Sequence, residues 1–548
     1  MKFEVLDIDA LGRIGKINTN RKEMVTPNLF PVIHPYKNLL PMVDFKEIGA
    51  QAVFTNAYII FQSQNKREIV LDKGIHEFLN FDGFIATDSG AFQQYIYKDK
   101  EMIINPADIE GFQEDIGSDF PVILDIPVQL DDTHEKAEIK VNETIKRAKE
   151  NIERRRNENC NWFGPVHGGK YKDLLKKSIF EMNNLDFAVY AIGGLVKAFL
   201  NYRFDLTLDV LLTVKKNIIS NKPIHMFGLG LPQFFSLAVA CGCDLMDSAA
   251  YILYAKENRY FTLSTGTKNL EDLTEFPCHC PICVKYTPKE VLGFEDNLKT
   301  QLLAKHNLYL SFSELKTIRQ AIREGNLWEL VEQRIRNHPN LVKAFNIVKK
   351  NLDFFESQEK LYKNSGRLFG SSESINRPLI HRYNQRLISN YQVPRDARYL
   401  IILPELDVKG RTSPTINSWL DEIDRNEIIP RNSIHVVFLS NFLGIIPLNL
   451  IDTYPMGQYE AIGITEIKDN LYENCLLKTE IYLKSFSKSY KKFGILIPEF
   501  YINQYQENIK YYEDHPIRGL EILFKDKYYL DFSISNNIED ILLFFKAD

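Results

Sequence analysis

The sequence predicts an α/β protein whose N-terminal part is a (β/α)8 barrel of the TIM type. Three observations lead to this prediction. Short apolar runs alternate with helix-like segments over the first 250 residues, polar residues or glycines stand where these runs end, and a second set of apolar runs begins near residue 398. Because alternating strands and helices build parallel sheets, we expect a large barrel followed by a smaller α/β domain.

The apolar runs define the expected barrel strands. In chain order they are AVFTNAYII from residue 52, FIATDSG from 84, PVILDIPV from 121, FGPVHGG from 163, FAVYAIGG from 187, PIHMFGLG from 223 and CDLMDS from 243. Segments such as 134–158 and 206–219 lie between them and repeat apolar residues at helical spacing. This number of runs suits a barrel of about 250 residues.

The polar residues distinguish a barrel from a doubly wound sheet, which would show the same alternation. A doubly wound sheet concentrates its site at one switch point and usually carries a glycine-rich phosphate loop after the first strand. We find no such loop there. Barrels instead gather chemistry at the carboxyl ends of many strands, and polar residues or glycines end successive runs here: Asp88, Asp125, His167, Gly193, Gly194, Gly228 and Asp247.

Charge and composition suggest three domains. We assign residues 1–310 to the barrel, with a zinc-binding insertion at 276–310. Residues 311–395 should form a basic helical segment with a linker at 364–378, and residues 396–548 a separate C-terminal α/β domain. Residues 301–390 hold 15 Lys and Arg against 8 Asp and Glu, whereas residues 398–548 hold 16 against 22. A polyanion should therefore bind the basic segment, with these candidate contacts: Arg319, Arg323, Arg334, Arg336, Lys349 and Lys350.

A cysteine cluster predicts a structural zinc ion. The motif CHCPIC places Cys278, Cys280 and Cys283 within six residues, and His306 follows after 22 further residues. Zinc prefers four such ligands in a tetrahedron, and a site closed by three cysteines and a histidine leaves no position for catalytic water. His279 is a less favoured ligand. Unligated thiols or a catalytic metal are the alternatives.

Two acids predict chemistry at an anomeric carbon. Asp88 and Asp247 each end an apolar run and are followed by a serine. Either acid alone could simply cap the next helix. Two carboxylates at the rim of one barrel can also divide a glycosyl transfer between them, one attacking the sugar and the other handling protons.

Five sequence features together resemble the tRNA-guanine transglycosylase barrel. They are DSGAFQ from residue 88, VHGG from 166, AIGG from 191, the run from 224 to 267, and the cysteine cluster with its histidine. The resemblance covers about residues 20–310 in the expected order. It implies that Asp247 is the nucleophile that attacks C1′ of a tRNA ribose and holds the tRNA covalently, and that Asp88 is the general acid and base.

The resemblance also implies a pocket for the exchanged base. Ser89 and Phe92 should lie beside the base, and Phe92 and Phe227 should sandwich it by stacking. Asp125 should accept hydrogen bonds from the guanine edge. Gly193 and Gly194 should let the backbone approach the base closely. His167 stands where the family commonly has glutamine, so we expect it to read the base edge by a different hydrogen bond.

The residues after AIGG bear on the incoming base. Relatives that insert a base with a cationic arm carry an acid here, whereas this chain continues with Leu195, Val196 and Lys197. An apolar wall and a nearby cation disfavour an ammonium group and tolerate a nitrile. The resemblance then implies the archaeal branch, which replaces guanine 15 in the tRNA D-arm with 7-cyano-7-deazaguanine during archaeosine biosynthesis. It further implies a homodimer.

Other readings remain open. The stretch from 434 to 463 resembles the middle region of archaeosine synthases, so an archaeosine-synthase-like protein or a catalytically silent tRNA-binding paralogue is an alternative. Both keep the barrel, but the two acids argue against them. A barrel metallohydrolase would need a histidine cluster that the rim lacks. We find no leader and no run of about 20 apolar residues, and therefore expect a soluble cytoplasmic protein.

Overall fold

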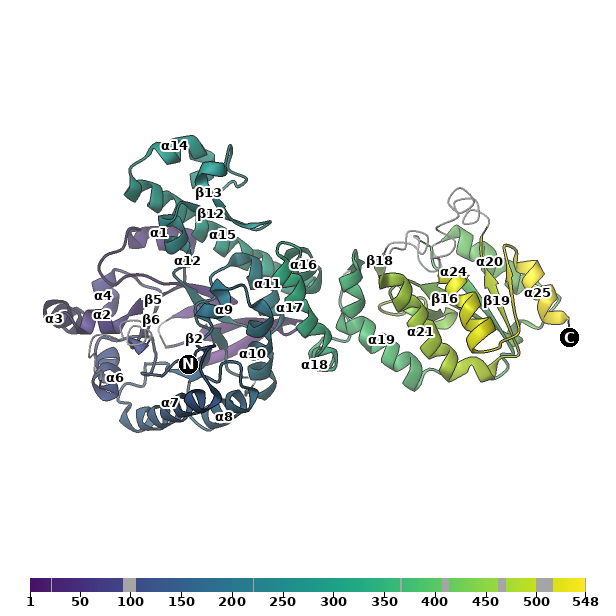
Figure 1. The fold of residues 1–548 in the computed structure, drawn as a ribbon, viewed down its shortest axis with the longest axis horizontal. Helices are drawn as coiled ribbons and strands as arrows, with labels where there is room; N and C mark the ends of the chain where they lie inside the picture. The colour runs from purple at the N-terminus through teal and green to yellow at the C-terminus, as the bar shows by residue number, and fades with distance from the viewer. Residues whose placement is uncertain are drawn as a thin grey trace. The chain divides into compact units, whose positions relative to one another are not determined.

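A computed structural model describes residues 1–20, 22–91, 105–219, 221–364, 367–406, 413–461, 470–498 and 516–547. The chain divides into two compact units, Met1–Lys350 and Asn351–Asp548 (Figure 1). The division falls inside the 311–395 segment that the sequence analysis set apart. Each unit is an α/β structure with parallel strands, which confirms the predicted fold class at that level.

Eight parallel strands of the first unit pair in a ring. They are β4 (Asn28–Pro31), β5 (Ala52–Asn56), β6 (Phe84–Asp88), β7 (Phe120–Pro121), β8 (Phe163–Val166), β9 (Val189–Ile192), β10 (Ile224–Met226) and β11 (Leu245–Ser248). They form two sheets, in the orders β5-β6-β7 and β4-β11-β10-β9-β8. Parallel bridges from Val32 to Phe54 and from Val122 to Phe163 join the sheets at both edges. The sequence analysis missed β4.

Helices connect the strands in the order that the alternation predicts. They are α1 (Met42–Ile48), α2 (Ala57–Phe61), α3 (Gln64–Lys73), α4 (Ile75–Leu79), α6 (Pro106–Asp115), α7 (His134–Arg154), α8 (Lys172–Asn183), α9 (Val196–Leu200), α10 (Phe204–Asn217) and α11 (Pro232–Ala240). Helix α7 shows why these segments are helical. Thr133 caps its first turn by accepting a hydrogen bond from the Lys136 amide, and residues at helical spacing such as Ala137, Val141 and Ile145 are buried.

An antiparallel sheet covers one end of the ring. Its strands are β1 (Lys2–Asp9), β2 (Gly12–Asn18) and β3 (Glu23–Thr26). Ile17 and Met24 from this sheet belong to the same buried cluster as the ring's inward-facing Phe54 and Phe163. Arg13 forms a buried ion pair of 2.7 Å with Asp244, which directly precedes β11. The sheet therefore lies at the amino ends of the strands, and their carboxyl ends remain available for the site.

The rest of the first unit follows the ring. It comprises α12 (Ala250–Lys256), the hairpin β12 (Arg259–Thr262) and β13 (Gly266–Asn269), α13 (Pro281–Lys285), α14 (Pro288–Gly293), α15 (Asp296–Glu324), α16 (Leu327–Ile335) and α17 (Pro339–Lys349). Helix α15 packs against α12 and β12. It ends at Gly325, whose positive φ of 71° forms the left-handed cap that glycine favours.

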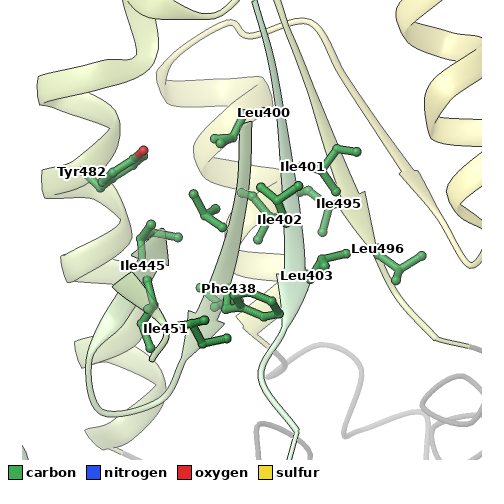
Figure 2. Packing of buried hydrophobic residues seen from close by; sticks show 14 of the residues in the cluster. Leu400, Ile401, Ile402, Leu403, Phe438, Ile445, Ile451, Tyr482, Ile495 and Leu496 are labelled. Atoms are coloured by element: carbon green, nitrogen blue, oxygen red, sulfur yellow. The ribbon is translucent and has the colours of Figure 1, made fainter. Parts of the chain in front are cut away.

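The second unit is built on a five-stranded sheet. In spatial order its strands are β17 (Gly444–Pro447), β16 (Ile434–Ser440), β15 (Tyr399–Pro404), β19 (Lys492–Leu496) and β20 (Phe532–Ser535). All pairs are parallel except β16 with β17. Leu400, Ile401, Ile402 and Leu403 are all buried, because side chains on both faces of this central strand are covered (Figure 2).

The helices of the second unit are α18 (Leu352–Gln358), α19 (Pro378–Asn390), α20 (Pro414–Arg425), α21 (Asn470–Phe486), α24 (Pro516–Ile522) and α25 (Ile538–Lys546). Helix α18 packs against α19, and the other helices contribute to the core around the sheet. Helix α21 packs against β17, and its Tyr482 lies in the cluster of Figure 2, whereas α25 packs against β19 and β20.

The segment expected to be a linker is folded where the structure describes it. Strand β14 (Arg367–Phe369) pairs in parallel with β18 (Tyr459–Ala461). Arg367 and Arg377 are buried, with exposed fractions of 0% and 1%, so residues 367–377 belong to the second unit rather than to a flexible connection. Throughout the described residues, no helix combines the length and the apolar character that crossing a membrane requires.

Candidate active site and metal centre

The ring brings most of the predicted site residues to one edge. Asp88 ends β6 and Asp247 lies near the end of β11. The others follow the strands between these two in ring order, with Asp125 after β7, His167 after β8, Gly193 and Gly194 after β9, and Phe227 after β10. Because all eight strands are parallel, these positions share the carboxyl end of the ring. Phe92, predicted to stack on the base, lies outside the described residues.

Asp88 holds its proton unusually tightly. Its pKa is raised to about 7, chiefly by burial, and the negative charges of Asp125 and Asp247 raise it further. Two hydrogen bonds oppose this shift: the Gly90 amide donates to Oδ1 at 3.2 Å, and the Asn56 side-chain amide donates to Oδ2 at 2.9 Å. A carboxyl group with a pKa near neutrality is suited to give up and take back a proton.

Asp247 lies in a different environment. One of its oxygens, Oδ1, is 2.7 Å from Nε2 of His225 and accepts a hydrogen bond of 3.2 Å from the Gly228 amide. Two contacts to one oxygen fix the orientation of this carboxylate. The sequence analysis did not identify His225 or Asn56 as site residues, although both lie on strands that it predicted.

The buried His167 side chain contacts Asp125. Its Nε2 lies 2.5 Å from Oδ2 of Asp125, and its side chain is 1% exposed. A carboxylate can only accept, so this nitrogen donates to Asp125. In the structure His167 therefore orients Asp125, the acid that was expected to read the guanine edge.

The remaining predicted residues line the same edge. Ser89 is buried, and its hydroxyl donates to the Ile123 carbonyl at 3.0 Å, which ties the turn after β6 to the next strand. A side chain at Gly193 would collide with the His167 ring, and one at Gly194, which has a φ of 78°, would collide with the Val128 carbonyl. Only glycine fits both positions.

Phe227 follows β10 and also lies at the carboxyl end of the ring. Its ring centroid lies 6.0 Å from Phe54, 5.9 Å from Phe163 and 5.1 Å from His225. Phe227 is nevertheless only partly buried, so the ring packs on the barrel core and keeps some of its surface accessible.

The four predicted metal ligands converge. The Sγ atoms of Cys278, Cys280 and Cys283 and a ring nitrogen of His306 all lie within 4.8 Å of one another. The Nδ1 atom of His306 is 3.5 Å from the sulfur of Cys280 and 3.3 Å from that of Cys283, and these two sulfurs are 3.5 Å apart. Ligands about 2.0–2.3 Å from a tetrahedral zinc ion would be separated by about 3.5 Å, so the donor set fits a metal ion.

The surroundings of His306 support the same conclusion. Its other ring nitrogen, Nε2, is 3.0 Å from the Phe261 carbonyl, which leaves the lone pair of Nδ1 directed at the thiols. The Tyr260 ring stacks on the imidazole at 3.7 Å. Hairpin β12–β13, the cysteine loop and α15 meet at this centre, which joins three parts of the chain.

Two of the basic residues expected to contact a polyanion are already engaged. Arg334 donates two hydrogen bonds, of 2.9 and 3.0 Å, to the buried carboxylate of Glu314. Arg319 donates to the Pro27 carbonyl at 2.7 Å, and burial lowers its pKa. Both side chains therefore serve packing within the first unit. Lys316 and Arg323, two turns apart on α15, are exposed.

Comparison with known proteins agrees with the geometry. A family model described as queuine tRNA-ribosyltransferase matches residues 8–340. The chain is 40% identical over 510 residues to a tRNA-guanine(15) transglycosylase of Methanococcus maripaludis, which covers 92% of this chain and 75% of the relative. Proteins of the same name from Methanocaldococcus jannaschii and Methanobrevibacter smithii are 38% and 39% identical, over 93% and 84% of this chain and 76% and 69% of theirs. The chain therefore belongs to the tRNA-guanine transglycosylase family, in its archaeal type, and is a pentosyltransferase.

Proposed function

We propose that this enzyme replaces guanine 15 of the tRNA D-arm with 7-cyano-7-deazaguanine, through a covalent bond between Asp247 and the ribose, as a step of archaeosine biosynthesis. In this proposal the eight-stranded ring is the catalytic (β/α)8 barrel, and residues 276–310 are its zinc-binding insertion. The observation that carries the proposal is the contrast between two carboxylates at one rim: Asp88 with a pKa raised to about 7, and Asp247 with one oxygen held by two donors.

The two acids divide the reaction between them. The ionised Asp247 attacks C1′ of the ribose, the bond from C1′ to the base breaks with its electron pair going to the base, and protonated Asp88 gives a proton to the departing guanine. The incoming base then loses a proton to the ionised Asp88 and attacks C1′, which releases Asp247. Asp88 ends the cycle protonated again.

The apolar wall beside the base supports the choice of a nitrile. Leu195 is buried at 1% exposure, and Val196 lies against Gly228 at the same rim. Lys197, however, pairs with Asp131 at 3.3 Å. The selectivity therefore rests on the absence of a carboxylate in the LVK sequence and on the apolar surface, rather than on repulsion by Lys197.

Two further parts of the proposal concern partners. We propose one structural Zn²⁺ per chain at the three cysteines and His306, and a homodimeric, cytoplasmic enzyme. We also propose that tRNA binds the rim and the basic face of α15, where Arg323 stays a candidate contact and Lys316 takes the place of Arg319 and Arg334.

Asp247→Asn should abolish base exchange, because the amide keeps the volume of the side chain but cannot attack as an anion. The variant should retain tRNA binding and its melting temperature. Wild-type enzyme incubated with tRNA should give a protein–RNA band that resists denaturant, and the variant should not. Incorporation of radiolabelled guanine or 7-cyano-7-deazaguanine, mapped by nucleotide position, measures the exchange. An adduct formed by Asp247→Asn would contradict the assignment of the nucleophile.

The pKa of Asp88 predicts a pH dependence. Adduct formation in a single turnover needs protonated Asp88, so its rate should fall as the pH rises through about 7. Asn56→Ser removes the donor that stabilises the ionised carboxyl group, which raises its pKa further and should move the falling limb to higher pH. Serine retains the cap that Asn56 supplies to α2. If the falling part of the pH–rate profile stays in place or moves to lower pH in this variant, Asp88 is not the proton donor.

Cys280→Ser should release the metal. We expect the bound zinc to fall from one ion per chain to nearly none, with a melting temperature lower by at least about 5 °C, because closure of the site contributes folding free energy. Cys160→Ser is the control, since a serine can still donate to the Ser118 carbonyl as the thiol does. Elemental analysis and calorimetry give both readouts. Unchanged stability in metal-free Cys280→Ser would exclude a structural role.

Charge reversal on α15 tests the tRNA surface. The double variant K316E/R323E should bind tRNA about tenfold more weakly and show a smaller slope of log K against log salt concentration, since phosphate contacts release counterions. The variant K176E/K177E on α8 carries the same change in net charge and should have little effect. Equal weakening by both double variants would mean that only net charge matters and that α15 is not the contact.

A further inference from the structure

His225 is a buried polar residue inside the barrel. It is the middle residue of β10, and none of its surface is exposed to solvent. Four aromatic rings surround it, with centroid distances of 5.6 Å to Phe30, 6.1 Å to Phe54, 5.0 Å to Phe163 and 5.1 Å to Phe227. An apolar side chain would suit such surroundings better, because a buried polar group costs free energy unless it is hydrogen-bonded.

Among the residues that the structure describes, the polar contact of this ring is with Asp247. Nε2 lies 2.7 Å from Oδ1 of the acid, whereas Nδ1 has no hydrogen-bond partner among the described residues. Since a carboxylate only accepts, Nε2 carries the hydrogen. The polar contact of the ring is therefore the hydrogen bond that Nε2 donates to Asp247.

The Gly228 amide reaches the same oxygen. It donates to Oδ1 at 3.2 Å, and its position depends on a left-handed backbone with a φ of 78° that favours glycine. Two donors therefore hold Oδ1 of Asp247: the His225 ring on β10 and the Gly228 amide in the turn after it. Neither of them contacts Oδ2. Side chain and backbone together fix the rotation of the carboxylate.

We propose that His225 is the positioning residue of the nucleophile: with the Gly228 amide it holds Oδ1 of Asp247, so that Oδ2 is the atom that attacks the ribose. This inference rests on the proposed function. A lone pair of Oδ2 forms the bond to C1′ while the bond from C1′ to guanine breaks and its electrons leave with the base, which takes the proton of Asp88. His225 keeps its proton throughout and exchanges none with the substrate.

A matched pair of substitutions tests this role. Methionine and glutamine have nearly the same size and flexibility, but only glutamine can donate from the position of Nε2. His225→Met should slow adduct formation and kcat by about 100-fold, because a misplacement of about 1 Å has an effect of that order. KM for tRNA should change by less than about threefold, because Asp247 contributes to the reaction rather than to binding. His225→Gln should restore the rate to within about fivefold of wild type.

The outcomes separate this inference from the proposed function. Slow His225→Met beside a faster His225→Gln, with melting temperatures near that of the wild type, supports the positioning role. Equal rates in the two variants, whether fast or slow, would overturn it, because the donor would then have no effect. If His225→Met fails to fold, His225→Leu takes its place in the pair. An active Asp247→Asn would instead refute the proposed function itself, whatever the His225 variants show.

Discussion

Packing of large aromatic rings inside the barrel holds the active-site strands in place. Phe30, Phe54, Phe120 and Phe163 come from four different strands and meet in one buried cluster, with neighbouring centroids about 6 Å apart. His225 and Phe227 lie directly against this cluster. A close-packed interior resists small displacements, so the positions of His225, which contacts Asp247, and of Phe227 are set by the core. The chemistry at the rim thus depends on packing one layer below it.

The site also shows how one residue type is placed in two different environments. Asp88 and Asp247 both end strands of the same ring, but burial dominates the first and raises its pKa, whereas two hydrogen bonds hold an oxygen of the second. Asp125 is a third acid, and its neighbour His167 fixes its orientation. The strand that carries each acid decides which donors it meets. Position in the ring, rather than the type of side chain, therefore makes the surroundings of the three acids differ.

Much of this arrangement could be predicted from the sequence, because runs of apolar residues and close cysteine spacing are local patterns. The metal ligands and the order of seven strands are examples. Strand β4 was not predicted because Pro27, Pro31 and Pro35 interrupt its apolar run, and proline within a run argues against a strand. The apolar run from 434 to 448 forms a hairpin, with Gly444 at a φ of 78° starting β17. The contacts of His167 and His225 join neighbouring strands, and a sequence does not show which buried histidine meets which acid.

Ring closure has a consequence for how the protein is made. The first barrel strand, β4, pairs with the last, β11. Residues 28–31 therefore cannot form this pairing until residues 245–248 have been synthesised. During synthesis, the early strands leave the ribosome with an unpaired edge until more than 200 further residues follow, and such edges invite pairing with other chains. The antiparallel sheet of β1, β2 and β3 pairs residues that are close in sequence, and Ile17 and Met24 from it pack into the buried cluster of the barrel. These contacts cover the amino end of the barrel, whereas the edge of β4 meets its partner only after β11 has been made.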